Sequence, residues 1–189
     1  MMTKTSNFGI KRPFSLLFPL IILSFILGCS SPSEPTDAGD ETLIQLQDPL
    51  DEPEYYCVDV PGFRDTLDLE GALTAHTCKP NSEDELFVFE SEAGQLRMEA
   101  YGLCVEAEGA AAGASLLLRD CDPERPLQKF TFANDQIQLG NALCLAISAA
   151  DGEPTGGPSH LRRDLMLQSC AEVESALSQW TMPGPEPIE

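Results

Sequence analysis

Basic residues are scarce in this sequence of 189 residues, which has 11 lysines and arginines against 31 aspartates and glutamates. The formal net charge is −20. A surface of that charge repels the phosphates of nucleic acids and the headgroups of anionic lipids, so the sequence argues against a nucleic-acid-binding protein. Neutral sugars and basic proteins are not excluded. For most of the acidic residues we expect the ordinary role of keeping the surface soluble.

Histidine is also rare, with 2 residues in the chain. The sequence has no His-Glu-x-x-His, no Gly-x-Ser-x-Gly and no glycine-rich phosphate loop, so the common catalytic signatures are missing. Ser159 and His160 are neighbours, but adjacent residues rarely point at each other productively. The acidic segment 48–54 (DPLDEPE) lacks the glycine spacing of a calcium loop and is predicted to be a solvated linker. We therefore expect a protein that is not an enzyme and has no metal or cofactor.

Long apolar runs are missing too, apart from one near the start of the chain. The mean hydropathy of −0.12 excludes a multi-span membrane protein. The exception is the run 14–27, which follows three basic residues and no acidic one. It is too short to cross a bilayer comfortably, and the order of basic and then apolar residues is typical of an export signal.

The junction Leu27-Gly28-Cys29 resembles the lipobox of bacterial lipoproteins, in which the cysteine is acylated and becomes the new N-terminus. The resemblance implies a signal peptide at 1–28, a lipid anchor on Cys29, and a disordered acidic tether over 29–41. Ser30 stands where an aspartate would resemble an inner-membrane retention signal, so we expect the outer membrane of a bacterial cell envelope. The alternatives are an ordinary signal peptide with an incidental cysteine and an uncleaved anchor helix. The tail 184–189 is predicted to be disordered.

The other six cysteines form a regular series: Cys57, Cys78, Cys104, Cys121, Cys144 and Cys170. An exported chain meets an oxidising compartment, so three disulfides are expected, although spacing alone does not fix their connectivity. The sequence around the cysteines favours disulfides between cysteines that are neighbours in the series, because the same pattern of residues is repeated three times. Each unit opens on a related piece (YYCVDVPG, GLCVEAEG, ALCLAISA) and closes on an aromatic one (DELFVF, LQKFTF, LSQWTM).

Three copies of about four short strands, without a convincing long amphipathic helix, predict an all-β fold with pseudo-threefold symmetry. One unit cannot bury its own apolar face, so the three must share a core and close on each other. The segment 148–164 is predicted to be a long loop. The residues that we expect in the shared core are Leu86, Phe87, Phe89, Leu96, Leu116, Leu118, Phe130, Phe132, Ile137 and Trp180.

The unit CVDVPG…GALTAHTC…DELFVF resembles a ricin B-type lectin repeat, and three such units resemble the β-trefoil of that family. The resemblance covers residues 42–183, with repeats at about 42–92, 93–134 and 135–183. It implies one disulfide within each repeat and a carbohydrate-binding function. The family's closing Gln-x-Trp motif is only partly kept, as Glu85-Leu86-Phe87, Gln128-Lys129-Phe130 and Ser178-Gln179-Trp180.

In this family a sugar lies in a shallow pocket of one repeat, between an aspartate that follows the first cysteine and a flat side chain before the second. The resemblance places five residues of the first repeat in that pocket: Asp59, Thr74, His76, Asp84 and Glu85. The alternative is that Asp59 is a turn residue and His76 an ordinary exposed strand residue. In the second repeat the corresponding candidates are Glu106, Arg119 and Gln128, with an acid that is one methylene longer. The third repeat has Ala146 in the aspartate position and is predicted to be structural.

The five polar residues at the pocket positions of the first repeat, together with the resemblance, predict a membrane-anchored, non-catalytic lectin for a neutral glycan or polysaccharide. The alternative is a trefoil that has lost its sugar sites and serves as a structural or protein-interaction domain. For that alternative the strong negative charge implies a basic protein partner.

Overall fold

The computed structural model describes residues 40–62, 64–156 and 160–183. The predicted signal peptide, the acylated Cys29, most of the predicted tether and the C-terminal tail therefore lie outside the described residues. Within the described ranges, no helix is long and apolar enough to span a membrane.

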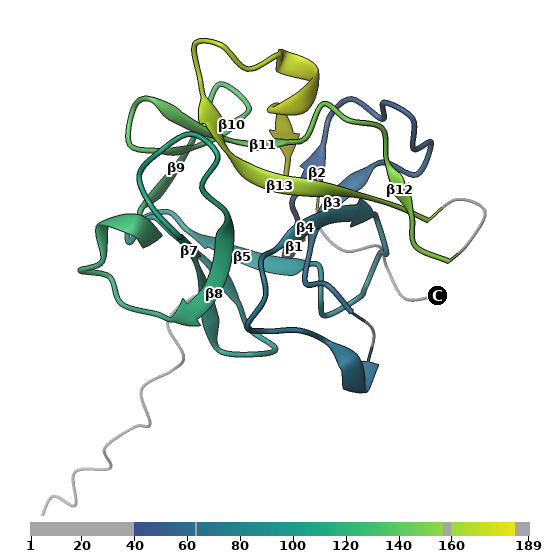
Figure 1. The fold of residues 1–189 in the computed structure, drawn as a ribbon. Helices are drawn as coiled ribbons and strands as arrows, with labels where there is room; N and C mark the ends of the chain where they lie inside the picture. The colour runs from purple at the N-terminus through teal and green to yellow at the C-terminus, as the bar shows by residue number, and fades with distance from the viewer. Residues whose placement is uncertain (1–39, 63, 157–159, 184–189) are drawn as a thin grey trace, which may run out of the picture. The chain divides into compact units, whose positions relative to one another are not determined.

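Short β-strands make up each of the three predicted repeats (Figure 1). The first repeat contains β1 (Thr42–Leu43), β2 (Gln45–Leu46), β3 (Tyr56–Asp59), β4 (Thr74–Thr77) and β5 (Leu86–Glu90). The second contains β6 (Gln95–Met98), β7 (Leu103–Ala107), β8 (Leu116–Asp120) and β9 (Phe130–Ala133). The third contains β10 (Gln136–Leu139), β11 (Leu143–Ile147), β12 (Glu153–Pro154), β13 (Leu161–Ser169) and β14 (Trp180–Thr181). Among the described residues, three single-turn 3₁₀ helices lie between strands: η1 (Arg64–Thr66), η2 (Pro126–Gln128) and η3 (Ser175–Leu177).

One antiparallel hairpin recurs in every repeat: β3–β4, β7–β8 and β11–β13. The first cysteine of each pair is the second residue of the opening strand, and the second cysteine directly follows the returning strand. The disulfides are Cys57–Cys78, Cys104–Cys121 and Cys144–Cys170, so the expected pairing within repeats is confirmed. Each closes a loop of 17 to 26 residues, which is worth about 3 kcal/mol in the chain-entropy view. The predicted all-β, trefoil-like architecture is confirmed.

The hairpins are joined into two curled sheets (Figure 1). One has the order β1-β5-β6-β7-β8, and the other has the order β14-β2-β3-β4-β13-β11-β10-β9. The long strand β13 pairs with β11 of its own repeat and, at its start, with β4 of the first repeat. This pairing brings the third repeat beside the first-repeat hairpin.

The closing aromatic of each repeat fills the common core. Phe87, Phe130 and Trp180 are all at most 1% exposed. The other predicted core residues are buried, except that Phe89 is half-buried and Phe132 is 38% exposed. The prediction for Phe132 was wrong because β9 is the edge strand of its sheet, and there only Phe130 of the strand is buried.

The segment 148–164 is more ordered than the predicted long loop. It contains β12 and the start of β13, which pair with each other in register Glu153↔Arg162. Arg163 is buried on β13, and its guanidinium bonds Asp51 at 2.6 Å and lies 5.3 Å from the centre of the Tyr56 ring.

The acidic segment 48–54 is likewise not a solvated linker. Its Glu52 is fully buried and accepts the Thr77 hydroxyl at 2.7 Å, while Asp51 accepts the Tyr56 hydroxyl at 2.8 Å. The hydrogen bonds from Gly152, Arg163 and Tyr56 outweigh burial and lower the pKa of Asp51 to about 2. These acids therefore attach the start of the first repeat to the hairpins that follow it.

Candidate functional site

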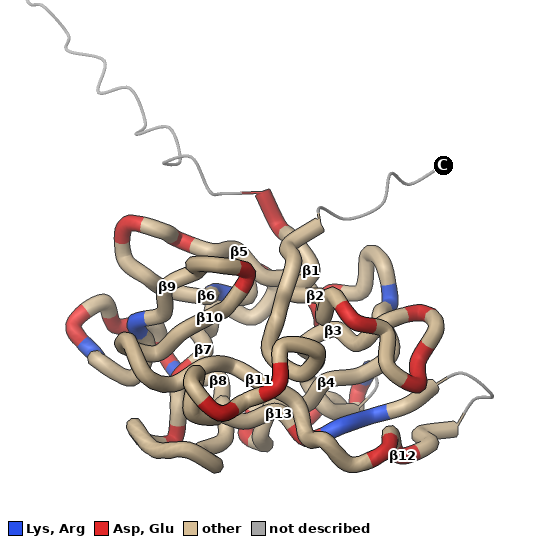
Figure 2. The backbone as a smooth tube through the Cα atoms, turned by 90° about the horizontal axis from the view of Figure 1, so that it is seen from above, with Lys and Arg blue, Asp and Glu red and all other residues tan. Residues whose placement is uncertain are grey.

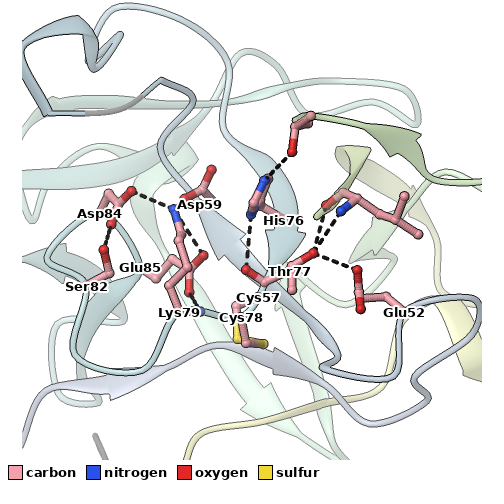
Figure 3. Close-up of polar contacts among 12 residues, drawn as sticks. Glu52, Cys57, Asp59, His76, Thr77, Cys78, Lys79, Ser82, Asp84 and Glu85 are labelled. Atoms are coloured by element: carbon pink, nitrogen blue, oxygen red, sulfur yellow. Dashed lines mark hydrogen bonds and ion pairs between the residues drawn. A yellow bond between two sulfur atoms is a disulfide. The ribbon is translucent and has the colours of Figure 1, made fainter. Parts of the chain in front are cut away.

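A pocket of about 320 Å³ opens at the end of the β3–β4 hairpin in the first repeat. Its wall includes Asp59, Thr74 and His76, three of the five residues predicted there, together with Lys79. The two other predicted residues, Asp84 and Glu85, lie behind Lys79 rather than in the wall (Figure 3). The structure thus brings the five predicted residues together, three in the pocket wall and two beside Lys79.

The hairpin register explains why these side chains meet. Asp59 pairs with Thr74 across the ladder, and Cys57 pairs with His76, so the two strands deliver acid, hydroxyl and ring to one end. The Cys57–Cys78 disulfide fixes the returning strand just before Lys79. The turn after Asp59 needs Gly62, because its φ is +113° and a side chain there would collide with the backbone oxygen of Thr66.

Lys79 is the centre of an ionic cluster that the sequence did not reveal (Figure 3). Its Nζ lies 2.7 Å from Asp59 Oδ1, 2.7 Å from Asp84 Oδ2 and 3.4 Å from Glu85 Oε1. The Ser82 hydroxyl donates to the other oxygen of Asp84. All three carboxylates are at most 6% exposed, so Lys79 is the cation that makes their burial tolerable.

Glu85 has a second, structural role. Its Oε2 accepts the backbone N–H of Lys79 at 2.6 Å, the residue after the second cysteine. Gln128 does the same in the second repeat, since its Oε1 accepts the N–H of Asp122 at 2.9 Å. The first position of the closing motif therefore fastens the chain after each of these two disulfides, and Glu85 supports the pocket from behind.

Burial dominates the electrostatics of the cluster. It raises the pKa of Asp59 to about 7 and that of Glu85 to about 8, although Lys79 acts in the opposite direction. For Asp84, hydrogen bonds from Lys79 and Ser82 outweigh burial and hold the pKa below its usual range. Burial alone would lower the pKa of Lys79, but the carboxylates, above all Asp59, raise it. Three carboxylates share one ammonium, so the cluster retains a proton near neutral pH and titrates as a unit.

His76 is half-buried and presents its ring to the pocket. Its Nδ1 lies 3.1 Å from the backbone oxygen of Thr77, and its Nε2 lies 2.8 Å from the hydroxyl of Thr155. Burial lowers the pKa of His76, which favours the neutral ring. A neutral ring is a better flat apolar surface than a hydrated cation.

The second repeat brings Glu106 and Gln128 together. Glu106 Oε2 accepts from Gln128 Nε2 at 2.8 Å and from Arg125 at 2.9 Å. Arg119, at the position of the flat side chain, donates to the backbone oxygen of Leu118 at 2.7 Å. The carboxylate of Glu106 is therefore already hydrogen-bonded by side chains of its own repeat.

In the third repeat, residues at the corresponding positions are buried or bond the backbone of the repeat itself. Ala146 is fully buried, and Ser178 donates to the backbone oxygen of Glu174 at 3.1 Å. Trp180 donates from its indole Nε1 to the backbone oxygen of Leu145 at 2.9 Å and belongs to the core.

Lys79 and Arg162 are the charged residues of the pocket wall that sequence reasoning missed. Isolated basic residues usually lie on the surface, so nothing in the local pattern marks either of them. One signal for Lys79 was present: three acids assigned to one pocket require a cation, and Lys79 is the nearest in the repeat.

The fold and the pocket define a disulfide-bonded β-trefoil with a polar site at the end of one hairpin. A model of the ricin-type β-trefoil lectin domain family matches residues 51–180, and the chain belongs to this family of carbohydrate-binding domains. No curated protein sequence matches the chain.

Several solved structures share the fold at low sequence identity. Cytolethal distending toxin from Actinobacillus actinomycetemcomitans is 16% identical with a TM-score of 0.55, over 82% of this chain and 96% of that one. The C-half of the earthworm R-type lectin, solved in complex with GalNAc, is 12% identical with a TM-score of 0.53, over 76% and 98%. GalNAc-T7, solved with UDP, GalNAc and Mn²⁺, is 17% identical with a TM-score of 0.54, over 79% and 23%. These similarities concern the fold.

Proposed function

We propose that the chain is a non-catalytic lectin whose sugar site is the pocket of the first repeat. The observation that carries the proposal is that a carboxylate, a hydroxyl and an imidazole ring, from Asp59, Thr74 and His76, line one cavity. A pyranose has hydroxyls that require charged or polar partners and a C–H face that packs on a flat ring. The volume of about 320 Å³ lies within the usual range for small-ligand pockets.

Asp59 and Lys79 supply an acceptor and a donor side by side. A sugar hydroxyl both donates and accepts, so one hydroxyl can bond the carboxylate and the ammonium together. Asp59 is 3% exposed, and a bound sugar would share it with Lys79 rather than displace the pair. Thr74 Oγ1 is buried without a hydrogen-bond partner among the described residues, so a sugar reaches it only after the Thr74 side chain turns toward the cavity.

We expect the Asp59→Asn variant to lose at least about tenfold in glycan affinity, because the amide weakens the charge-assisted bond to the hydroxyls. The measurement is a glycan array with the full-length chain, followed by calorimetry on the best neutral glycan. His76→Ala should lose a similar amount, because the flat surface is removed.

The matched control is Glu106→Gln, which changes the acid at the corresponding position of the second repeat and should leave the affinity unchanged. Absence of binding to any glycan on the array would refute the lectin proposal. Equal affinity of Asp59→Asn and the unaltered chain would instead place the sugar elsewhere on the domain.

We also propose that the domain is held on the outer membrane of a bacterium by acyl chains on Cys29. The support is the apolar run that ends in Gly28-Cys29, and two or more acyl chains on one residue anchor a domain stably. Growth with a labelled fatty acid should label the chain, and Cys29→Ser should abolish the label and release the protein from membranes. Ser30→Asp should keep the label but move the protein to the inner membrane. Labelling that survives Cys29→Ser would contradict the anchor.

A further inference from the structure

The third repeat supplies part of the first-repeat pocket. Because β13 pairs with β4, Arg162 lies opposite His76 in the ladder. On its other side the start of β13 pairs with β12. Figure 2 shows the basic stretch of β13 next to the acidic residue of β12; Arg162 and Glu153 form an ion pair of 2.7 Å there. Thr155, just after β12, and Arg162 both line the pocket. The cavity therefore has walls from two repeats.

The contact between these walls is a hydrogen bond on the His76 ring (Figure 3). The Thr77 carbonyl can only accept, so the Nδ1 atom 3.1 Å from it carries the ring proton. Nε2 is then an acceptor, and the Thr155 hydroxyl, 2.8 Å away, donates to it. The one proton of this hydroxyl has a second acceptor within reach, the His160 carbonyl 3.1 Å away. That carbonyl also accepts the Thr155 N–H at 2.9 Å, so it stays hydrogen-bonded when the hydroxyl donates to Nε2.

We propose that Thr155 is a positioning residue of the first-repeat sugar site, which holds the His76 ring in one orientation and in its neutral form. The proposal rests on the proposed lectin function, in which His76 is the surface on which the sugar packs. With Nδ1 and Nε2 both bonded, rotation of the ring about χ2 breaks two hydrogen bonds. A donor on Nε2 also opposes protonation of that atom.

The other groups near His76 act in mixed directions. Lys79 and the His160 ring, whose centre is 5.8 Å from that of His76, oppose a charge on His76, and Asp84 favours one. Arg162, which lies opposite His76 in the ladder, is paired with Glu153 at 2.7 Å, and the hydrogen bond to the Thr77 carbonyl favours a charge. Removal of the Thr155 hydroxyl alone leaves all of these in place. It therefore isolates the contribution of the hydrogen bond.

Thr155→Val tests the proposal, with Thr155→Ser as the rescue variant and Thr131→Val, an exposed threonine of β9, as the control. The readout without ligand is the pKa of His76, measured by NMR titration of the full-length chain. The chain has 2 histidines, and His160→Asn assigns their signals. We expect the pKa of His76 to rise in Thr155→Val and to stay unchanged in Thr155→Ser and Thr131→Val. An unchanged pKa in Thr155→Val would overturn the proposal.

The second readout is affinity for the glycan selected by the unaltered chain. Thr155→Val should bind it about fivefold more weakly, which corresponds to one lost hydrogen bond, and Thr155→Ser should restore the affinity. Undiminished binding by Thr155→Val would overturn the positioning role even where the lectin function holds. Absence of binding by the unaltered chain would refute the lectin function instead, and the titration would still decide the contact between Thr155 and His76.

Discussion

Trp180→Ala is expected to lower the free energy of unfolding by about 4 kcal/mol, the cost of deleting a fully buried large aromatic. The Trp180 side chain is 0% exposed and belongs to the main hydrophobic cluster, to which all three repeats contribute. Its loss also removes the hydrogen bond from Nε1 to the Leu145 carbonyl, which joins β14 to β11. A domain of this size is stable by about 5–15 kcal/mol, so the change would be a large part of the total. Urea unfolding followed by circular dichroism measures it.

Phe132→Ala is the control for this prediction, because it deletes an aromatic that is 38% exposed. Its cost should be below about 1 kcal/mol, as for most surface substitutions. Equal losses in the two variants would contradict the burial difference and, with it, the shared core. The disulfides remain in both variants, so a difference between them reports the packing of Trp180 together with its one hydrogen bond.

The fold was largely predictable because its signals are local and repeated. The cysteines open and close the same hairpin three times, and the apolar pieces beside them predict strands directly. Phe132 shows the limit of this reasoning. Phe130 and Phe132 lie two positions apart in β9 and so share one face of the strand, but only Phe130 is buried. The pattern of a strand gives its two faces, whereas its position at a sheet edge depends on the whole topology.

The candidate site was predictable only in part, because some of its residues come from a distant part of the chain. Asp59 and His76 occupy positions that the repeat pattern identifies. Lys79 meets Asp59 from the residues just after the same hairpin, whereas Arg162 reaches the pocket from β13 of the third repeat, opposite His76. No periodicity encodes a neighbour such as Arg162, since it depends on how hairpins of different repeats approach each other. Thr155 belongs to the same class, since it lies 79 positions after His76 in the sequence.

The same contacts distinguish the candidate pocket of the first repeat from the corresponding positions of the other two. In the second repeat Arg125 and Gln128 occupy Glu106, and in the third repeat Ala146 has no acceptor to offer. In the first repeat the acid is held by Lys79, whose ammonium can also donate to a ligand. The first repeat therefore combines a buried charge pair with an open cavity.

Lys79→Met should destabilise the protein in a strongly pH-dependent way. In the folded state the pKa values of Asp59 and Glu85, about 7 and about 8, lie above the ordinary values of 3.8 and 4.5 that apply to an unfolded chain. The folded state thus binds protons that the unfolded state has released, so the contribution of these groups to stability falls as pH rises from about 4 to about 8. Without Lys79 the folded pKa values rise further, so the fall extends to higher pH and its total size increases.

The expected loss for Lys79→Met is about 3 kcal/mol at pH 8, the cost of leaving buried carboxylates without a cation, and below about 1 kcal/mol at pH 4. Urea unfolding at both pH values measures it, with Lys129→Met, an exposed lysine, as the control that should change little at either. Adding Asp59→Asn and Glu85→Gln to Lys79→Met removes the uncompensated charges and should recover most of the loss at pH 8. A loss of equal size at pH 4 and pH 8 would show that Lys79 acts through the packing of its aliphatic stem, and the ionic account of the cluster would then be wrong.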